Sequence, residues 1–272
     1  MVTFPRAKIN FGLRITGRRR DGFHDIESFF YPIGLSDALE FVTQGPGAVD
    51  DILEITGLSI PGRSDDNLIL KCVRMMRELY PIPFLKVHLH KVIPTGAGLG
   101  GGSSDASAIL KYINRYFNIC LSDEKLMELS AKLGSDCPFF IKSVPSYVTG
   151  RGEIMKDAES FLEGYYMVLL NPGINISTKD AYQNCHPARH SSKLTGIVSR
   201  GPAAWKRYIR NDFEDYAFSI HPEIGDLKTS LYSEGALYSS MTGSGSSVYG
   251  LFSEKPALSP ETRKHLIYEG ML

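Results

Sequence analysis

The residues best suited to chemistry in this chain form a glycine- and serine-rich run at positions 94–107, PTGAGLGGGSSDAS. Its five glycines allow the backbone to approach a ligand without Cβ atoms in the way. If a helix follows, the free N–H groups of its first turn and the positive end of its dipole face an anion. Ser103 and Ser104 add hydroxyl donors. The run predicts a phosphate-binding loop, with a flexible linker as the alternative.

Two elements are expected to hold this run in place. Residues 85–93 (LKVHLHKVI) alternate branched apolar and polar side chains, which is typical of a β-strand. Residues 106–117 carry apolar side chains at helical spacing, which predicts a helix. Linkers are rarely flanked in this way, and Leu99 inside the run is expected to act as an apolar anchor. These flanks favour the phosphate loop.

Two common phosphate-loop patterns fit poorly. The Walker A pattern needs a lysine directly before Ser or Thr, but Gly102 precedes Ser103. The dinucleotide pattern G-x-G-x-x-G matches three of the glycines and requires an acidic residue about 20 positions further on, after the next strand. Asp123 and Glu124 lie near that distance, yet they open a predicted helix. A dinucleotide site is therefore a weak alternative.

Composition narrows the class of protein. The chain has 272 residues, of which 43% are hydrophobic, enough for one large or two ordinary globular domains. Its formal net charge is zero, which argues against a nucleic-acid-binding surface. We find no run of 18 apolar residues and no signal-peptide pattern. The four scattered cysteines suggest reduced thiols, so we expect a cytoplasmic protein without a membrane partner.

Three polar residues outside the loop are candidates for a site. Lys8 lies in a predicted strand at residues 4–13, where a lysine is more often solvated than catalytic. Asp136 lies between a glycine turn and two phenylalanines, so it is either a helix cap or a carboxylate close to a substrate. His24 follows an Asp-Gly turn and could be a surface residue or face a ligand.

The remaining elements are outlined by caps, breakers and periodicity. We predict helices after Asn67, Ser122 and Ser177, and strands near 146–156, 165–170, 236–240 and 247–252. Residues 184–201 have the composition of a loop. His88 and His90 share one face of their strand and, without a third candidate ligand nearby, are interpreted as structural.

Four segments, in this order and spacing, resemble the GHMP small-molecule kinases. They are residues 7–10 (AKIN), 94–104 (PTGAGLGGGSS), 133–140 (LGSDCPFF) and 242–245 (TGSG). Together with DGFH at 21–24, they resemble the branch of the family that acts on a cytidyl diphosphate derivative of methylerythritol. The resemblance covers nearly the whole chain. The family usually has tyrosine where this chain has Phe23, which keeps a ring and loses a hydroxyl.

The resemblance implies an α+β, two-lobed GHMP kinase fold with the active site in the cleft between the lobes. We expect an ATP-binding lobe at 1–155 and a C-terminal lobe at 156–272. The implied activity is ATP- and Mg²⁺-dependent phosphorylation of the C2 hydroxyl of 4-diphosphocytidyl-2-C-methyl-D-erythritol, in the non-mevalonate route to isoprenoids. The protein is expected to be a monomer or a weak homodimer. Which protein groups bind the metal is left open, although Ser104 is possible.

The resemblance also assigns roles to single residues. Asp136 would take the proton of the substrate hydroxyl, and Lys8 would lie beside it and stabilise charge on the transferred phosphoryl group. Phe23 and Tyr182 would stack on the cytosine, His24 would read its edge and Asn10 would lie near the erythritol. ATP would be bound by Pro94, Thr95, Gly96, Ala97, Gly98, Leu99, Gly100, Gly101, Gly102, Ser103 and Ser104, with Asn67 near the adenine.

Three other functions remain open on sequence grounds. A different GHMP kinase, acting on homoserine or mevalonate, would share the loop but should lack a cytosine pocket. An oxidoreductase would use the dinucleotide pattern. A binding protein without activity could keep the loop, although the presence of both Lys8 and Asp136 argues against it.

Overall fold

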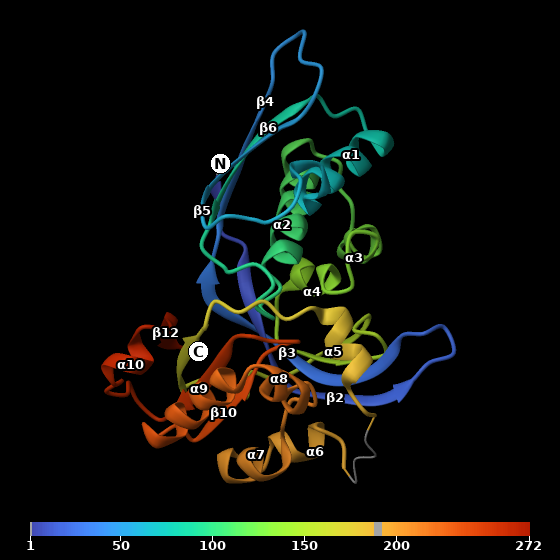
Figure 1. Cartoon of the computed structure of the whole chain (residues 1–272). Helices are drawn as coiled ribbons and strands as arrows, with labels where there is room; N and C mark the ends of the chain where they lie inside the picture. The colour runs from blue at the N-terminus through green and yellow to red at the C-terminus, as the bar shows by residue number, and fades with distance from the viewer. Residues whose placement is uncertain (1, 188–191) are drawn as a thin grey trace. The chain divides into compact units, whose positions relative to one another are not determined.

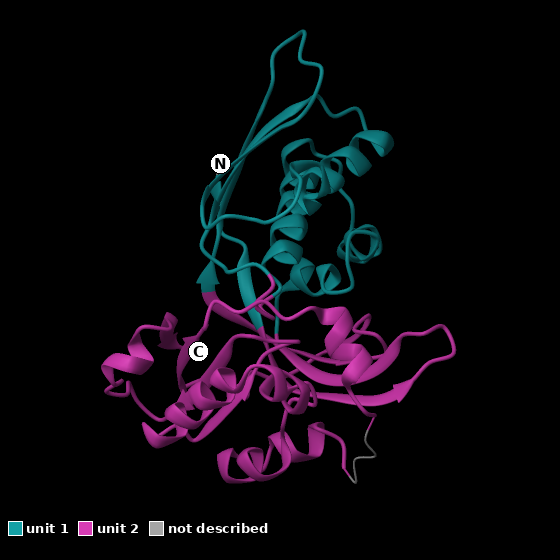
Figure 2. Cartoon of the chain, in the orientation of Figure 1, with its two compact units in different colours: residues 1–8, 35–95, 100–144 teal, residues 9–34, 96–99, 145–272 magenta. Residues whose placement is uncertain are grey.

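The structure, a computed structural model, describes residues 2–187 and 192–272. These residues form two compact units (Figure 2). Unit 1 contains the described residues up to Lys8, Leu35–Thr95 and Gly100–Val144; unit 2 contains Ile9–Gly34, Gly96–Leu99 and the described residues from Pro145 to Leu272. Both units contain strands and helices, as expected for an α+β fold. The lobes 1–155 and 156–272 divide the chain differently and stay a prediction.

Unit 1 is built on a four-stranded sheet with the order β1–β4–β6–β5. Strand β6 pairs with β4 in the antiparallel sense and with β5 in the parallel sense. Figure 1 shows the helices of this unit on one side of the sheet. The elements are β1 (Val2–Thr3), β4 (Ala38–Thr43), β5 (Ile52–Gly57), a 3₁₀ turn (Ser64–Asp66), α1 (Leu68–Leu79), β6 (Leu85–Lys91), α2 (Gly101–Tyr116), α3 (Asp123–Ala131) and α4 (Cys137–Lys142).

Local sequence signals explain why the unit 1 helices begin where they do. The side chain of Asn67 accepts a hydrogen bond from Ile69 N and caps α1, and Ser122 caps α3 through Lys125 N. The buried faces of these helices and of β6 form one apolar core, which includes Val73, Leu89 and Ile109. Helix α1 and strand β6 thus confirm the predictions made from spacing.

Unit 2 contains a second sheet, which is antiparallel throughout and has the order β10–β11–β9–β12, and it has its own apolar core. A third sheet has the order β2–β3–β7–β8, and its first two strands pass from one unit into the other. The elements are β2 (Arg6–Arg18), β3 (His24–Ser36), β7 (Ser146–Thr149), β8 (Ile154–Asp157), β9 (Tyr166–Leu170), α5 (Thr178–Asn184), α6 (Thr195–Val198), α7 (Pro202–Tyr208), α8 (Glu214–Ile220), α9 (Pro222–Ser233), β10 (Tyr238–Met241), β11 (Val248–Phe252), α10 (Pro260–Arg263) and β12 (Leu266–Met271).

The structure corrects three predictions of secondary structure. Helix α2 begins at Gly101, inside the glycine-serine run and not at residue 106, because tertiary packing overrides the low helix propensity of glycine. Helix α6 lies within the predicted loop 184–201. Strand β12, which the sequence analysis missed, pairs with β9 at the edge of its sheet, where a strict alternation of apolar side chains is not required.

None of the described helices combines the length and the apolar composition that crossing a membrane would require. All four cysteines are free thiols, as predicted.

Candidate active site

The predicted phosphate loop connects β6 to α2. Three of its glycines, Gly96, Gly98 and Gly100, have φ values of 68°, 76° and 70°. Gly100 caps α2 in the left-handed conformation and offers no side chain to the first turn. The N–H groups of that turn have no partner within the helix and are suited to an anion. Gly102 is exposed, and beyond its chain neighbours and the backbone of its own helix no heavy atom lies within 4 Å of the position that a Cβ would take, which leaves room for a phosphate.

The tip of the loop packs within unit 2 on the second glycine-serine turn. The Thr242 hydroxyl donates to Gly98 O at 3.1 Å, and Ser247 N donates to Ala97 O at 3.3 Å. A Cβ on Gly98 would collide with the Thr242 carbonyl oxygen, so this position requires glycine for space as well as for its φ. Leu99 is buried, in agreement with its predicted role as an anchor.

Lys8 and Asp136, which are far apart in the sequence, form an ion pair in unit 1. Lys8 Nζ lies 3.3 Å from Asp136 Oδ2, and the two side chains are 4% and 34% exposed. A Cβ on Gly100 would be 3.3 Å from Lys8 Cε, so the lysine lies beside the N-terminus of α2. The pair therefore combines a partly exposed carboxylate with a buried ammonium group, next to an anion-binding helix end.

The helix-cap alternative for Asp136 is not what the structure shows. Asp136 occupies the residue before α4, but its side chain makes no capping hydrogen bond and its backbone is helical, with φ −85° and ψ −15°. A capping aspartate normally has an extended backbone and accepts a bond from the first turn. The Asp136 carboxylate contacts the Lys8 ammonium instead.

Sequence analysis missed a buried cluster at the base of the loop. Lys91 Nζ donates to Asp37 Oδ2 at 2.6 Å and to Asp105 Oδ2 at 2.7 Å. Burial, with a further contribution from neighbouring Asp37, raises the pKa of Asp105 to about 7, although the Lys91 charge opposes this shift. The other carboxylate oxygen of Asp105 is buried without a hydrogen-bond partner among the described residues.

A signal for this cluster was present in the sequence. Lys91 follows Leu85, Val87 and Leu89 at a period of two, so the alternation places it on the buried side of β6. A buried lysine requires a carboxylate partner. The alternation alone cannot identify that partner, because Asp37 precedes β4 and Asp105 lies in α2.

The other predicted ATP-binding side chains are engaged within unit 1. The Ser104 hydroxyl donates to Arg6 O at 2.7 Å and is almost fully buried. Ser103 is hydrogen-bonded to the Cys137 thiol, whose pKa is raised to about 11, mainly by burial. The Asn67 side chain caps α1. Their contacts with ATP stay predictions, as do those of Pro94 and Thr95 at the start of the loop.

The predicted base-binding residues lie in unit 2. His24 and Tyr182 stack with their ring centroids 5.2 Å apart and an angle of 21° between the planes. Burial, with a contribution from the charge of Arg18, lowers the pKa of His24, so its ring is neutral at pH 7. Phe23 is 53% exposed, and the Arg151 guanidinium lies 4.5 Å from its ring centroid. The structure thus pairs Tyr182 with His24, and Phe23 with Arg151.

Asn10 is buried in unit 2 and connects two segments. Its backbone N–H donates to Thr242 Oγ1 at 2.9 Å, and its side-chain Nδ2 donates to Ser28 Oγ at 3.0 Å. Asn211 supports the same turn, because its Nδ2 donates to Met241 O at 2.9 Å and to Gly243 O at 2.7 Å. Asn211 and Thr242 therefore hold the surface on which the loop tip packs.

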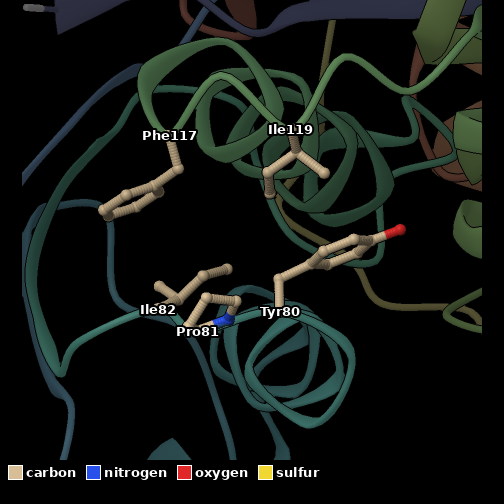
Figure 3. Close-up of a pocket in the computed structure, with 5 residues that line it drawn as sticks. All are labelled: Tyr80, Pro81, Ile82, Phe117 and Ile119. Carbon is tan, nitrogen blue, oxygen red and sulfur yellow. The ribbon is translucent and has the colours of Figure 1, made fainter.

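Two further features lie apart from these residues. His88 and His90 both contact the Thr56 hydroxyl at 3.0 Å, and no group of three or more potential metal-binding side chains exists in the described part of the chain. Unit 1 also contains a cavity of about 280 Å³, and Figure 3 shows the side chains that line it. Its lining residues, none of which belongs to the loop or the Lys8–Asp136 pair, are Tyr80, Pro81, Ile82, Phe117 and Ile119.

Comparison with known proteins finds two family models and close to full-length relatives that match this chain. Family models for the GHMP kinase N-terminal domain and the GHMP kinase C-terminal domain match residues 67–143 and 194–261. A 4-diphosphocytidyl-2-C-methyl-D-erythritol kinase of Bacteroides thetaiotaomicron is 44% identical over 262 residues, or 96% of this chain and 95% of the relative.

Solved structures agree with these matches. The crystal structure of a 4-(cytidine 5'-diphospho)-2C-methyl-D-erythritol kinase has a TM-score of 0.78 at 29% identity, with 92% of this chain and 90% of the other covered. A homoserine kinase from Cytophaga hutchinsonii has a TM-score of 0.69 at 17% identity, over 97% of this chain and 86% of the other, which shows a common fold alone.

These matches exclude the dinucleotide alternative, and the structure agrees, because Asp123 opens α3 and does not follow a strand. Lys8, in the first of the segments that resemble the family, pairs with Asp136 in the third, and Thr242 in the fourth contacts the loop tip. The chain belongs to the GHMP kinase family and, within it, to the 4-diphosphocytidyl-2-C-methyl-D-erythritol kinases.

Proposed function

We propose that this protein phosphorylates the C2 hydroxyl of 4-diphosphocytidyl-2-C-methyl-D-erythritol with ATP, a step of the non-mevalonate route to isopentenyl diphosphate. The observation that carries the proposal is the ion pair between Lys8 and Asp136 beside the N-terminus of α2. A family match at 44% identity over nearly the whole chain supports the choice of substrate.

In this proposal Asp136 accepts the proton of the substrate hydroxyl. Its carboxylate is partly exposed, so an alcohol can reach it, and the Lys8 ammonium lies 3.3 Å from one of its oxygens. The same ammonium group stabilises negative charge on the phosphoryl group as it transfers. The C2 hydroxyl is a crowded tertiary alcohol, so we expect positioning to supply much of the rate.

Residues 94–104 bind the ATP phosphates through the N–H groups at the N-terminus of α2, with the open position at Gly102 leaving space. The partly exposed Asp136 carboxylate is an oxygen donor of the kind that Mg²⁺ accepts alongside phosphate oxygens, whereas the Ser104 hydroxyl is almost fully buried and donates to Arg6 O. When bound, Mg²⁺ neutralises phosphate charge. Asn67 lies near the adenine in this proposal.

Aromatic and polar side chains are proposed to recognise the cytidyl group. The ring of Tyr182 stacks on the base, and Phe23, supported by Arg151, provides the second ring. His24 is neutral because its pKa is lowered, so its ring can both donate and accept a hydrogen bond at the base edge. Since His24 stacks on Tyr182 in this structure, we expect its ring to move when cytosine binds. Asn10 contacts the substrate near its erythritol.

The composition of the chain supports proposals for the partners and the compartment of the enzyme. A balanced charge supports a small-molecule substrate and gives no basic surface for nucleic acid. Free cysteines support a reducing compartment, and we place the enzyme in the cytoplasm. We propose a monomer or a weak homodimer with no membrane partner.

A turnover assay with ATP and a series of alcohols tests the proposal. The cytidyl substrate should be phosphorylated, whereas methylerythritol phosphate, homoserine and mevalonate should give at most a small fraction of its kcat/KM. Equal activity without the cytidyl group would contradict the proposed substrate and leave a kinase of another small alcohol.

A further inference from the structure

Two buried carboxylates hold the two ends of strand β6 in unit 1. At the start of the strand, Asp51 accepts Leu85 N at 2.8 Å and pairs with both terminal nitrogens of Arg77 at 2.6 and 2.7 Å. At the end of the strand, Asp37 Oδ1 accepts the next two backbone N–H groups at 2.6 and 2.8 Å. Only this second end continues into the phosphate loop.

At the loop end, a lysine bridges the strand to the following helix. The Lys91 ammonium contacts Asp37 and Asp105, and the three side chains are 1%, 0% and 3% exposed. A Cβ on Gly101 would be 3.0 Å from Lys91 Nζ, so the ammonium lies directly beneath the first residue of α2. The bridge thus spans the loop from the last residue of β6 to the second turn of α2.

We propose that Lys91, Asp37 and Asp105 are positioning residues that fix the N-terminus of α2 for binding of the ATP phosphates. The proposal rests on the proposed function in one respect, namely that this loop binds ATP. The N–H groups at a helix end bind an anion only if they converge on it, and their direction is set by where the helix begins relative to the strand. Charged hydrogen bonds in a buried site are short and directional, so they fix this relation better than apolar packing does.

Asp105 is the part of the bridge that can be removed most cleanly. Without it, Lys91 and Asp37 remain a buried pair of opposite charges, so no lone charge is left behind. Asp105→Ala should therefore fold, while the tie between β6 and α2 is lost. Asp105→Asn keeps an oxygen that can accept from Lys91 and serves as the conservative variant.

The first measurement is the Kd of a non-hydrolysable ATP analogue by calorimetry, together with kcat and both KM values. Asp105→Ala should weaken analogue binding about tenfold or more, because misplacing binding groups by about 1 Å can cost up to about 10²-fold. The KM of the alcohol substrate should stay within about twofold, and Asp105→Asn should restore analogue binding to within about threefold.

Asp51→Ala is the matched control, because it removes a buried carboxylate from the other end of the same strand. It should lower the thermal midpoint at least as much as Asp105→Ala does, because Arg77 and Leu85 N lose their carboxylate partner, yet it should leave analogue binding within about twofold. Equal weakening by Asp51→Ala, or unchanged binding in a folded Asp105→Ala, would overturn the inference. If the unsubstituted protein binds the analogue but does not phosphorylate the cytidyl substrate, the proposed function fails and this inference stands.

Discussion

At the scale of single residues, the proposed chemistry depends on one ion pair and one ring stack. The side chains of Lys8 and Asp136 carry opposite charges 3.3 Å apart. Removing either side chain therefore takes an opposite charge away from the other. The Tyr182 ring stacks on His24 and makes a T-shaped contact with Phe213, with centroids 4.9 Å apart in the second pair. Each of these side chains can be tested by one substitution.

Asp136→Asn keeps the shape of the side chain but cannot accept a proton at neutral pH. We expect kcat to fall at least about 10²-fold, the usual range for a general base being about 10²–10⁴, with ATP affinity nearly unchanged. Steady-state kinetics would measure this, with Asp123→Asn, at an exposed residue of α3, as the control. If kcat falls less than about fivefold while the circular dichroism spectrum is unchanged, Asp136 only positions the substrate.

The Lys8→Ala variant tests whether the two groups act as one unit. It should also lower kcat, and the double variant with Asp136→Asn should lose less than the product of the two single losses. This expectation follows from the direct contact of the side chains. Multiplicative losses in the double-variant cycle would show that the two residues act independently.

Tyr182→Ala should raise the KM of the cytidyl substrate about tenfold or more, because stacking on a base contributes about 1–3 kcal/mol. The KM for ATP should not change. Kinetics with each substrate varied in turn would measure both constants, and Tyr208→Ala, a half-exposed tyrosine of α7, is the control. A rise in the KM for ATP instead would place Tyr182 at a different site.

At the scale of elements, the phosphate loop depends on contacts at its base and at its tip. The base belongs to unit 1, where the charged bridge of Lys91 joins β6 to α2. The tip, Gly96–Leu99, belongs to unit 2 and packs on the turn that contains Thr242. A loop of this length needs such contacts, because its glycines would otherwise sample many conformations.

Gly98→Ala tests the packing of the tip. The new Cβ would collide with the Thr242 carbonyl, so the tip must shift, and the KM for ATP should rise about tenfold or more. Gly173→Ala is the control, because Gly173 has nearly the same φ, 77° against 76°, with no atom within 4 Å of its Cβ position. Both variants should lose about 1–2 kcal/mol of stability through φ. Only Gly98→Ala should lose ATP affinity; equal losses would contradict the packing argument.

At the scale of the whole molecule, the two compact units each have an apolar core, and the charges inside unit 1 respond to pH. The pKa of Asp105 is raised to about 7, whereas an aspartate in an unfolded chain titrates near about 3.9. The folded state therefore binds this proton more tightly than the unfolded state does. The stability that this bound proton contributes is fully present below pH about 4 and is lost as the pH rises through about 7.

The free energy of unfolding should accordingly fall between pH about 4 and about 7 relative to that of Asp105→Asn, which cannot lose a proton. Urea unfolding followed by circular dichroism across this range would measure the difference. Asp123→Asn, which changes an exposed carboxylate, should follow the unsubstituted protein. Parallel profiles for the unsubstituted protein and Asp105→Asn would contradict the raised pKa.

The local features of this protein could be predicted from its sequence. Alternation over residues 85–93 predicted β6, the capping residues Asn67 and Ser122 predicted the starts of α1 and α3, and the glycines predicted a bend through positive φ between β6 and α2. These features depend on neighbours within a few residues, where side-chain period and backbone preference act directly.

Contacts between distant residues were decided by the tertiary structure. The proximity of Lys8 to Asp136 was expected only from the resemblance to the family, and the bridge among Asp37, Lys91 and Asp105 was not expected at all. The alternation in β6 determines that Lys91 is buried, but no local rule says which carboxylate reaches it. That choice is made when strands and helices pack, because a buried charge is stable only where the fold brings an opposite charge to it.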